Sequence, residues 1–232
     1  MSNQLSTFKT AVLLFNSTSK QHASLMQLAP NMPTKKVVGL LEVLNGRATA
    51  IVKKTKLPLF QVDINKKLDF GAQTYEAYQK LFDQGFQSVI GISNDCPALS
   101  SQDILIAANA LKTKQVVLGP ANDGGLYLFG LCNNQLSKQE FTHLNWQTKS
   151  LSAEVKRVCT SKTIVTLTEK ADMDTVADFI AALKSKFEHL RDFFAQLFSF
   201  TERVVRALVE IKIAFFFKNL SLRAPPEWVI VR

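Results

Sequence analysis

The chain has 232 residues, of which 47% are apolar and 20% charged, a composition that excludes a disordered protein and is typical of a globular one. Its net charge of +9 suits a phosphate-bearing ligand or an acidic membrane surface, but the sequence carries no nucleic-acid recognition motif, so no nucleic-acid partner is expected. Three cysteines without a C-x-x-C spacing argue against a disulfide framework and a zinc site, and a reducing cytoplasm fits them best.

Strand-like and helix-like segments alternate along most of the chain. The predicted strands are residues 11–15, 59–64, 88–93, 115–119, 126–131 and 163–167. The predicted helices are 19–28, 35–54 (as one helix or two), 70–85 with Gly85 at its end, one that begins after Ser100 with Asp103 in an S-x-x-D capping pattern, 150–159 and 174–187. This order predicts an α/β fold with a mostly parallel sheet between layers of helices.

The basic residues are concentrated between Met32 and Lys67. Most of them are expected on a solvated helix face: Lys35, Lys36, Arg47, Lys53, Lys54, Lys56, Lys66 and Lys67.

Ligands of such sheets bind beyond the carboxyl ends of the strands, and the segment "SNDCPALS" follows a predicted strand directly. Pro97 has no amide hydrogen, so the strand cannot continue and Asp95 is held at its end. A hard cation such as Mg²⁺ prefers carboxylate oxygens of this kind. The alternative, equally favoured by this segment alone, is that Asp95 caps the turn into the next helix.

Two further segments carry acids at strand or helix ends. In "ANDGG", Asp123 precedes Gly124 and Gly125, which allow either a ligand close to the backbone or an ordinary turn. In "ADMDTVADF", Asp172 and Asp174 alternate along an extended stretch and so point the same way, although acids at a helix N-terminus are also favoured by the helix dipole alone.

Taken together, four segments resemble a bacterial glycosyltransferase-like family, the DUF2064 type, with the GT-A (nucleotide-diphospho-sugar transferase) fold. They are "VIGISNDCPALSSQDI", "VVLGPANDGGLYLFGL", "NWQTKSL" and "ADMDTVADF". The resemblance extends from about residue 70 to 182, and more loosely back to residue 10. It implies a three-layer α/β/α domain that acts as a metal-dependent transferase on a nucleotide-activated sugar donor. A nucleotidyltransferase of the same fold is the near alternative.

The resemblance also implies roles for individual residues. Asp95 and Asp174 would hold Mg²⁺ or Mn²⁺, and Asp123 would be the general base for an acceptor hydroxyl. The residues expected to contact a nucleotide or nucleotide sugar are Lys20, Gly71, Asn94, Gly124, Gly125, Trp146 and Thr148.

The sequence departs from the family on the donor side. The loop after the first strand, residues 15–25, lacks the family's glycine and arginine and has Lys20 as its single basic residue. Lys67 replaces a common glycine, Gln73 a common basic residue and Leu126 a frequent aromatic. Either the donor is recognised differently, with Lys66 and Lys67 as further candidates for phosphate contact, or the protein is a degenerate relative that binds a ligand or partner without turnover.

The resemblance does not cover the last fifty residues, so we predict a domain of residues 1–182 and a helical extension of 183–232. Eight of the 17 phenylalanines lie between Phe187 and Phe217, on two candidate amphipathic helices. Their apolar faces are expected to cover the sheet, to form a homodimer interface, or to place the protein at a membrane surface through residues 187–218.

Overall fold

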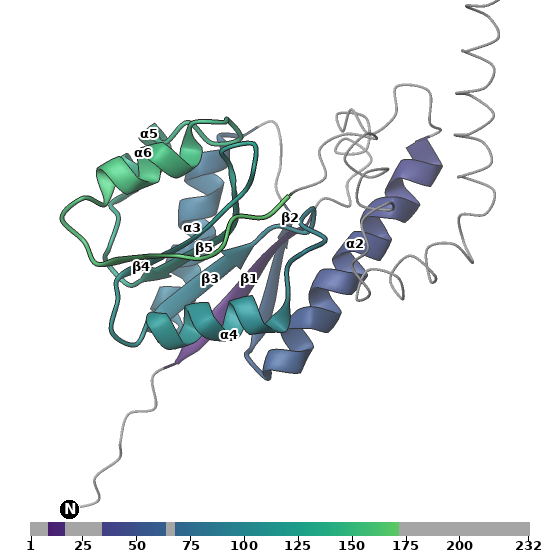
Figure 1. Cartoon of the computed structure of the whole chain (residues 1–232), viewed down its shortest axis with the longest axis horizontal. Coiled ribbons are helices and arrows are strands. Elements are labelled where there is room, and N and C mark those ends of the chain that lie inside the picture. Colours follow the sequence, from purple (N-terminus) through teal and green to yellow (C-terminus); the bar gives the residue numbers. More distant parts are fainter. Residues whose placement is uncertain (1–8, 17–33, 64–67, 172–232) are drawn as a thin grey trace, which may run out of the picture. The chain divides into compact units, whose positions relative to one another are not determined.

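The computed structural model describes residues 9–16, 34–63 and 68–171. The strands in this part of the chain form one sheet of six in the order β2-β1-β3-β5-β4-β6 (Figure 1). They are β1 (Thr10–Asn16), β2 (Leu59–Asp63), β3 (Ser88–Ile92), β4 (Val116–Pro120), β5 (Leu126–Cys132) and β6 (Ile164–Thr166). β5 runs antiparallel to both of its neighbours, and the other pairs are parallel. The predicted mostly parallel α/β fold is confirmed.

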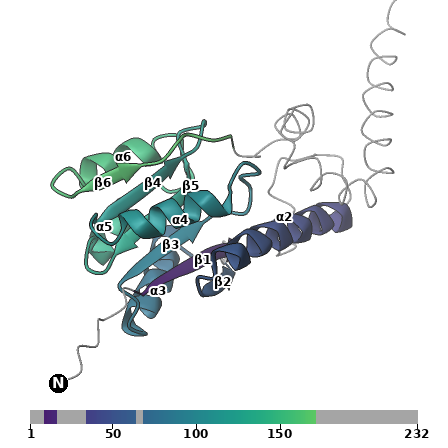
Figure 2. The same cartoon turned by 60° about the horizontal axis from the view of Figure 1, so that its bottom comes forward.

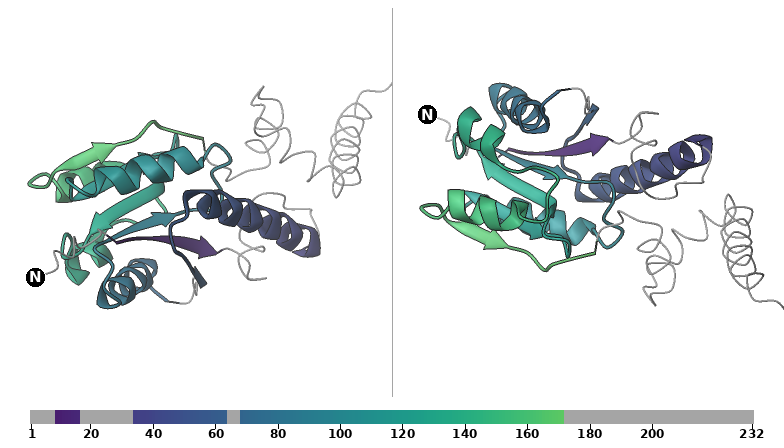
Figure 3. Two further views of the ribbon diagram at one scale, coloured as in Figure 1. Left: turned by 90° about the horizontal axis from the view of Figure 1, so that it is seen from below. Right: turned by 90° about the horizontal axis from the view of Figure 1, so that it is seen from above.

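Helices lie on both sides of the sheet, as Figures 2 and 3 show. They are α2 (Thr34–Thr55), α3 (Phe70–Asp83), α4 (Ser101–Ala110), α5 (Lys138–His143) and α6 (Leu151–Val158). Residues of α2 and α4 pack with one set of strand side chains, and residues of α3, α5 and α6 pack with the other set. The predicted helix 35–54 is a single helix.

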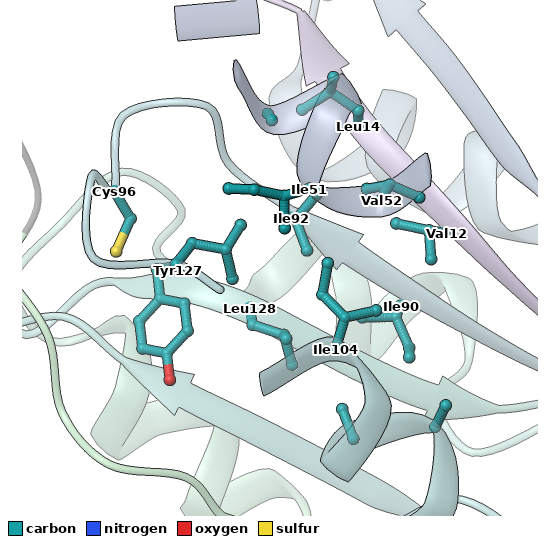
Figure 4. Packing of buried hydrophobic residues seen from close by; sticks show 14 of the residues in the cluster. Val12, Leu14, Ile51, Val52, Ile90, Ile92, Cys96, Ile104, Tyr127 and Leu128 are labelled. Carbon is teal, nitrogen blue, oxygen red and sulfur yellow. The ribbon is translucent and has the colours of Figure 1, made fainter. Parts of the chain in front are cut away.

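The two cores follow from the alternation of side chains along the strands. In β1, Val12 and Leu14 belong to the core beneath α2 and α4, whereas Ala11 and Leu13 belong to the other core. Figure 4 shows the first of these cores from close by. β3 and β4 are buried at every position, which is typical of central strands covered on both faces.

Tyr78 anchors α3 to the centre of the sheet. Its hydroxyl donates to the carbonyl oxygen of Phe129 (2.6 Å) and accepts from the amide of Gly91 (3.0 Å). A side chain at position 91 would collide with this hydroxyl, so only glycine permits the approach. Burial raises the pKa of Tyr78, and the hydroxyl stays protonated at neutral pH.

The helix ends are formed by the residues that the sequence indicated. Ser100 and Asp103 form a reciprocal capping box at the start of α4, and Gly85 follows the end of α3 with φ of +89°. The short helix α5 was not predicted, although Ser137 and Glu140 form a second capping box of the same pattern. The predicted helices 19–28 and 174–187 and the extension 183–232 lie outside the described residues. None of the helices in the described ranges is long and apolar enough to cross a membrane.

Candidate active site

The loops that follow β3 and β4 emerge at the same edge of the sheet, because both strands run antiparallel to β5 between them. Asp95 lies in the first loop and Asp123 in the second. The two carboxyl groups are close enough that the charge of Asp123 acts on the ionisation of Asp95. The structure therefore brings together two of the acids that the sequence singled out.

Asp95 is harder to ionise than an ordinary aspartate. Burial removes water from its carboxylate and raises its pKa, hydrogen bonds from Ser93 and from the backbone oppose this, and the negative charge of Asp123 makes the smallest contribution, again upward. Both acids are partly exposed, and a cation between or beside them would relieve the repulsion between the two carboxylates. This pair of acids fits a divalent ion with oxygen ligands.

Arg47 of α2 holds the loop directly after Asp95. Its guanidinium donates to the carbonyl oxygens of Cys96 (3.3 Å) and Leu99 (2.9 Å), and makes a close contact with that of Pro97. The prediction of a solvated position is therefore wrong for this residue, which is half-buried, while Lys53 and Lys54 of the same helix and Lys56 directly after it are exposed.

Asn94, expected to contact substrate, is only 5% exposed. Its side-chain amide donates to the side-chain oxygen of Asn45, two residues before Arg47 on α2, over 2.7 Å. The residues on both sides of Asp95 are thus fixed by neighbouring positions of one helix.

Lys170, beyond β6, ties the same loop to α4. Its ammonium group lies 2.9 Å from the carbonyl oxygen of Ala98 and 2.5 Å from a carboxylate oxygen of Asp103, and both side chains of the ion pair are 15% exposed. Burial alone would raise the pKa of Asp103, but hydrogen bonds from Lys170 and Ser100 outweigh it and hold the pKa below its usual value. No local pattern in the sequence indicates this contact, which joins residues 67 positions apart.

The loop after β4 forms a turn through its own atoms, and its backbone also bonds to Lys170 and Ser152. Asp123 Oδ1 accepts from the amide of Gly125 (2.7 Å), and the amide of Gly124 donates to the carbonyl of Ala121 (2.9 Å). Gly124 has φ of +93°, and the carbonyl of Lys149 occupies the space that a side chain there would need. The structure thus contains the predicted turn, and the turn presents Asp123 at the ligand edge.

Gly71 and Trp146 lie against each other. A side-chain carbon at position 71 would be 2.7 Å from the indole nitrogen of Trp146, which itself donates to the carbonyl of Phe141 over 2.7 Å. The indole also packs on Phe70 at a ring distance of 5.5 Å. Trp146 is thus one side of an aromatic cluster at the start of α3.

Thr148 is exposed, and its hydroxyl donates to the carbonyl of Asn145 (2.6 Å) within the loop between α5 and α6. Lys20 and Asp174, together with Asp172, Lys66 and Lys67, lie outside the described residues. Within the described ranges, no three of the His, Cys, Asp and Glu side chains gather as a metal cluster.

Cys96 is the buried thiol that its sequence context suggested. Burial and then the charge of Asp95 raise its pKa to about 12, so the thiolate needed for nucleophilic chemistry does not form at neutral pH. Cys132 and Cys159, like Cys96, are free of disulfide bonds.

In the described ranges, the strand order and the antiparallel β5 define an α/β protein with a mostly parallel sheet and acids at its carboxyl edge. The model of the family described as "Uncharacterized protein conserved in bacteria (DUF2064)" matches residues 37–148, and the resemblance predicted from the sequence is confirmed.

One solved structure shows that this is the nucleotide-diphospho-sugar transferase fold. The crystal structure of a "putative nucleotide-diphospho-sugar transferase" from Desulfovibrio desulfuricans G20 superposes with a TM-score of 0.71 at 20% identity, over 85% of this chain and 97% of that one. Rv0371c from Mycobacterium tuberculosis H37Rv, in a complex with manganese, is less similar, with a TM-score of 0.42 at 14% identity over 76% of this chain and 98% of that one. The 4-diphosphocytidyl-2C-methyl-D-erythritol synthase from Anaerococcus prevotii DSM 20548 has a TM-score of 0.45 at 11% identity over 76% of this chain and 99% of that one. No curated protein matches the chain.

Proposed function

We propose that the protein is a metal-dependent transferase that uses a nucleotide-activated sugar as donor. The observation that carries this proposal is the pair Asp95 and Asp123, placed by two loops at the carboxyl edge of the sheet, where Asp123 raises the pKa of Asp95. In open α/β sheets this edge is where ligands bind. The fold shared with the transferase from D. desulfuricans supports the same class of reaction.

Asp95 and Asp174 would hold the ion, Mg²⁺ or Mn²⁺. Asp95 fits this role because a cation would relieve both its desolvation and its repulsion by Asp123. The role of Asp174 is supported by the resemblance of the segment "ADMDTVADF" to the family. When bound, such an ion neutralises and orients a diphosphate leaving group.

The other residues would bind and orient the reactants. Asp123 would take the proton of the acceptor hydroxyl, whose oxygen forms a bond to the sugar carbon as the bond from that carbon to the diphosphate oxygen breaks. Gly125 allows the acceptor or the sugar to approach the backbone of the turn, while Gly124 gives the turn its shape and makes room for the carbonyl of Lys149. Lys20, Asn94, Trp146 and Thr148 remain the proposed contacts for the nucleotide sugar, with Gly71 admitting the indole.

The free cysteines favour a cytoplasmic location, since disulfides are rare in that compartment. A homodimer or a membrane-surface contact through residues 187–218 remains a prediction from the sequence.

The second candidate is a relative that binds a nucleotide without turnover. Gln73 stands where a basic residue is common in the family, and its side-chain amide donates to the carbonyls of Leu68 (3.3 Å) and Asp69 (3.2 Å) at the start of its own helix. A neutral side chain that bonds to its own backbone offers no positive charge to a donor phosphate, and this favours a weakened donor site.

Isothermal titration of the full chain with UDP-, GDP- and CDP-sugars and with the four nucleoside triphosphates, each with and without Mg²⁺, tests the proposal. We expect Mg²⁺-dependent binding of at least one sugar nucleotide, abolished by Asp95→Asn and by Asp174→Asn. Asp83→Asn removes an equal charge from an exposed position at the far end of α3 and should leave binding unchanged.

The outcomes separate the candidates. Binding with release of the nucleoside diphosphate in the presence of a suitable acceptor supports the transferase. Release of pyrophosphate from a triphosphate identifies a nucleotidyltransferase, and binding without any product supports the non-catalytic relative. Flat titrations with every compound, with and without the metal, would overturn all three.

A further inference from the structure

In the short loop that carries Asp95, several backbone carbonyl oxygens face the side chain of Arg47. Three of its carbonyl groups, those of Cys96, Pro97 and Leu99, converge on the guanidinium of Arg47. The oxygen ends of carbonyl dipoles repel one another when they face a common point, so this loop conformation depends on a cation at that point.

An arginine suits this position better than a lysine. Its planar guanidinium has five N–H donors in a fixed fork, so one side chain can reach several acceptors at once. Burial lowers the pKa of Arg47, which indicates that its charge is partly desolvated where it binds the loop.

A second bond from the same helix acts on the other side of Asp95. Asn94 precedes the acid, is buried, and donates to Asn45 over 2.7 Å. Asn45 and Arg47 are two residues apart on α2. Asn45 contacts the residue before Asp95, and Arg47 contacts residues after it. Helix α2 therefore brackets the acid from both sides.

We propose that Arg47 is a positioning residue, which fixes the Asp95 carboxylate at the edge of the sheet by holding the carbonyls of the following residues. The inference rests on the proposed function in so far as Asp95 binds the ion. It makes Arg47 of α2 a part of the site through the loop that carries Asp95. A change at Arg47 then alters metal affinity through the loop.

The test compares Arg47→Met, Arg47→Lys and Lys54→Met in the full chain. Methionine keeps much of the length of arginine but has no donor, lysine keeps the charge without the fork, and Lys54 is an exposed residue of the same helix. Hydrogen exchange of the peptide that covers residues 93–100 reports the loop directly. Titration with Mn²⁺ alone, followed by water-proton relaxation, reports the ion.

For Arg47→Met we expect exchange in the loop to become at least about tenfold faster while peptides of β1 and β5 keep their protection, and Mn²⁺ affinity to fall by about tenfold or more. Arg47→Lys should lie between wild type and Arg47→Met in both measurements. Lys54→Met should match wild type.

The inference is overturned if the loop of Arg47→Met exchanges as slowly as in Lys54→Met, or if the loop loosens and Mn²⁺ binds as before. Should Arg47→Met lose its fold throughout, Arg47→Lys decides by the same two measurements. If wild type itself binds no Mn²⁺, the proposed metal site fails, and loop exchange alone decides whether Arg47 positions Asp95.

Discussion

The two loops that bring acids to the ligand edge are held in opposite ways. The loop after β3 is fixed by side chains from remote parts of the chain: Arg47 and Asn45 reach it from α2, and Lys170 from beyond β6. The loop after β4 is closed by hydrogen bonds among residues 121–125, and the distant bonds that it also makes, to Lys170 and Ser152, are bonds between backbone groups. One acid is thus placed by side chains from distant segments, and the other by a local turn with backbone support.

The difference has a consequence for mutation. A loop held by remote side chains is sensitive to changes far away in the sequence, whereas a local turn is sensitive to the conformational demands of its own residues. Substitutions in the two loops and in their partners should therefore differ in both size and sign.

The largest effect is expected for Gly124→Ala in the local turn. The residue has a positive φ, and a methyl group would collide with the carbonyl of Lys149, so we expect a loss of about 3 kcal/mol in the free energy of unfolding. Gly46→Ala is the matched control, because Gly46 lies in α2 with no atom within 4 Å of the added carbon. It should stabilise the protein by about 0.5–1 kcal/mol.

Urea unfolding of both variants measures these changes. Equal stabilities for Gly124→Ala and wild type would contradict the turn geometry and the contact with Lys149.

Next in size is Lys170→Met, which removes a remote tether. It leaves the carboxylate of Asp103 partly buried without its ammonium partner, and we expect a loss of about 2 kcal/mol. The control is Lys138→Met, which breaks the exposed pair Lys138–Glu76 (3.6 Å) and should cost less than about 0.5 kcal/mol. Adding Asp103→Asn to Lys170→Met should recover part of the loss in a double-mutant cycle.

The pH dependence gives an independent check of this pair. The pKa of Asp103 is lowered in the folded protein, so its contribution is complete above the unfolded value of about 4 and is lost as pH falls through the folded pKa. In Lys170→Met this acid-side loss should shrink, which unfolding curves between about pH 2 and 5 will show. An unchanged pH profile would mean that the ion pair does not set the pKa of Asp103.

The contrast between the loops also explains what the sequence could predict. Pro97 and the glycines after Asp123 act on their own backbone, so the strand end and the turn could be read from adjacent residues. The contact of Arg47 with the loop could not be predicted in this way, because helical periodicity does not show which charged residue of α2 contacts a loop 49 residues later. The missed helix α5 is a different case, since Ser137 and Glu140 carried its capping signal.

In the remote loop, Asp95→Asn should stabilise the protein while it removes metal binding. The raised pKa of Asp95 means that its ionised form is disfavoured in the folded state, so stability falls as pH rises from the unfolded value of about 4 through the folded pKa. At pH 7 we expect a gain of about 1 kcal/mol, or about 2–4 °C in Tm for a domain of this size. The gain should vanish toward pH 4, and a loss of stability at pH 7 would show that the carboxylate is well paired in the free protein.

The smallest effect on stability is expected for Asp123→Asn in the local turn. Asparagine keeps the side-chain oxygen that accepts from the amide of Gly125, so the turn persists and the change should stay within about 0.5 kcal/mol. The lost charge acts on Asp95 in the neighbouring loop instead. The pKa of Asp95 should fall, because one of the two causes that raise it is gone. Carboxyl carbon shifts of Asp95 followed by NMR over pH will measure it, and Asp83→Asn should leave that titration unchanged. If Asp95 titrates alike in both variants, the two loops do not bring their acids into electrostatic contact, and each acid must then be assigned a function separately.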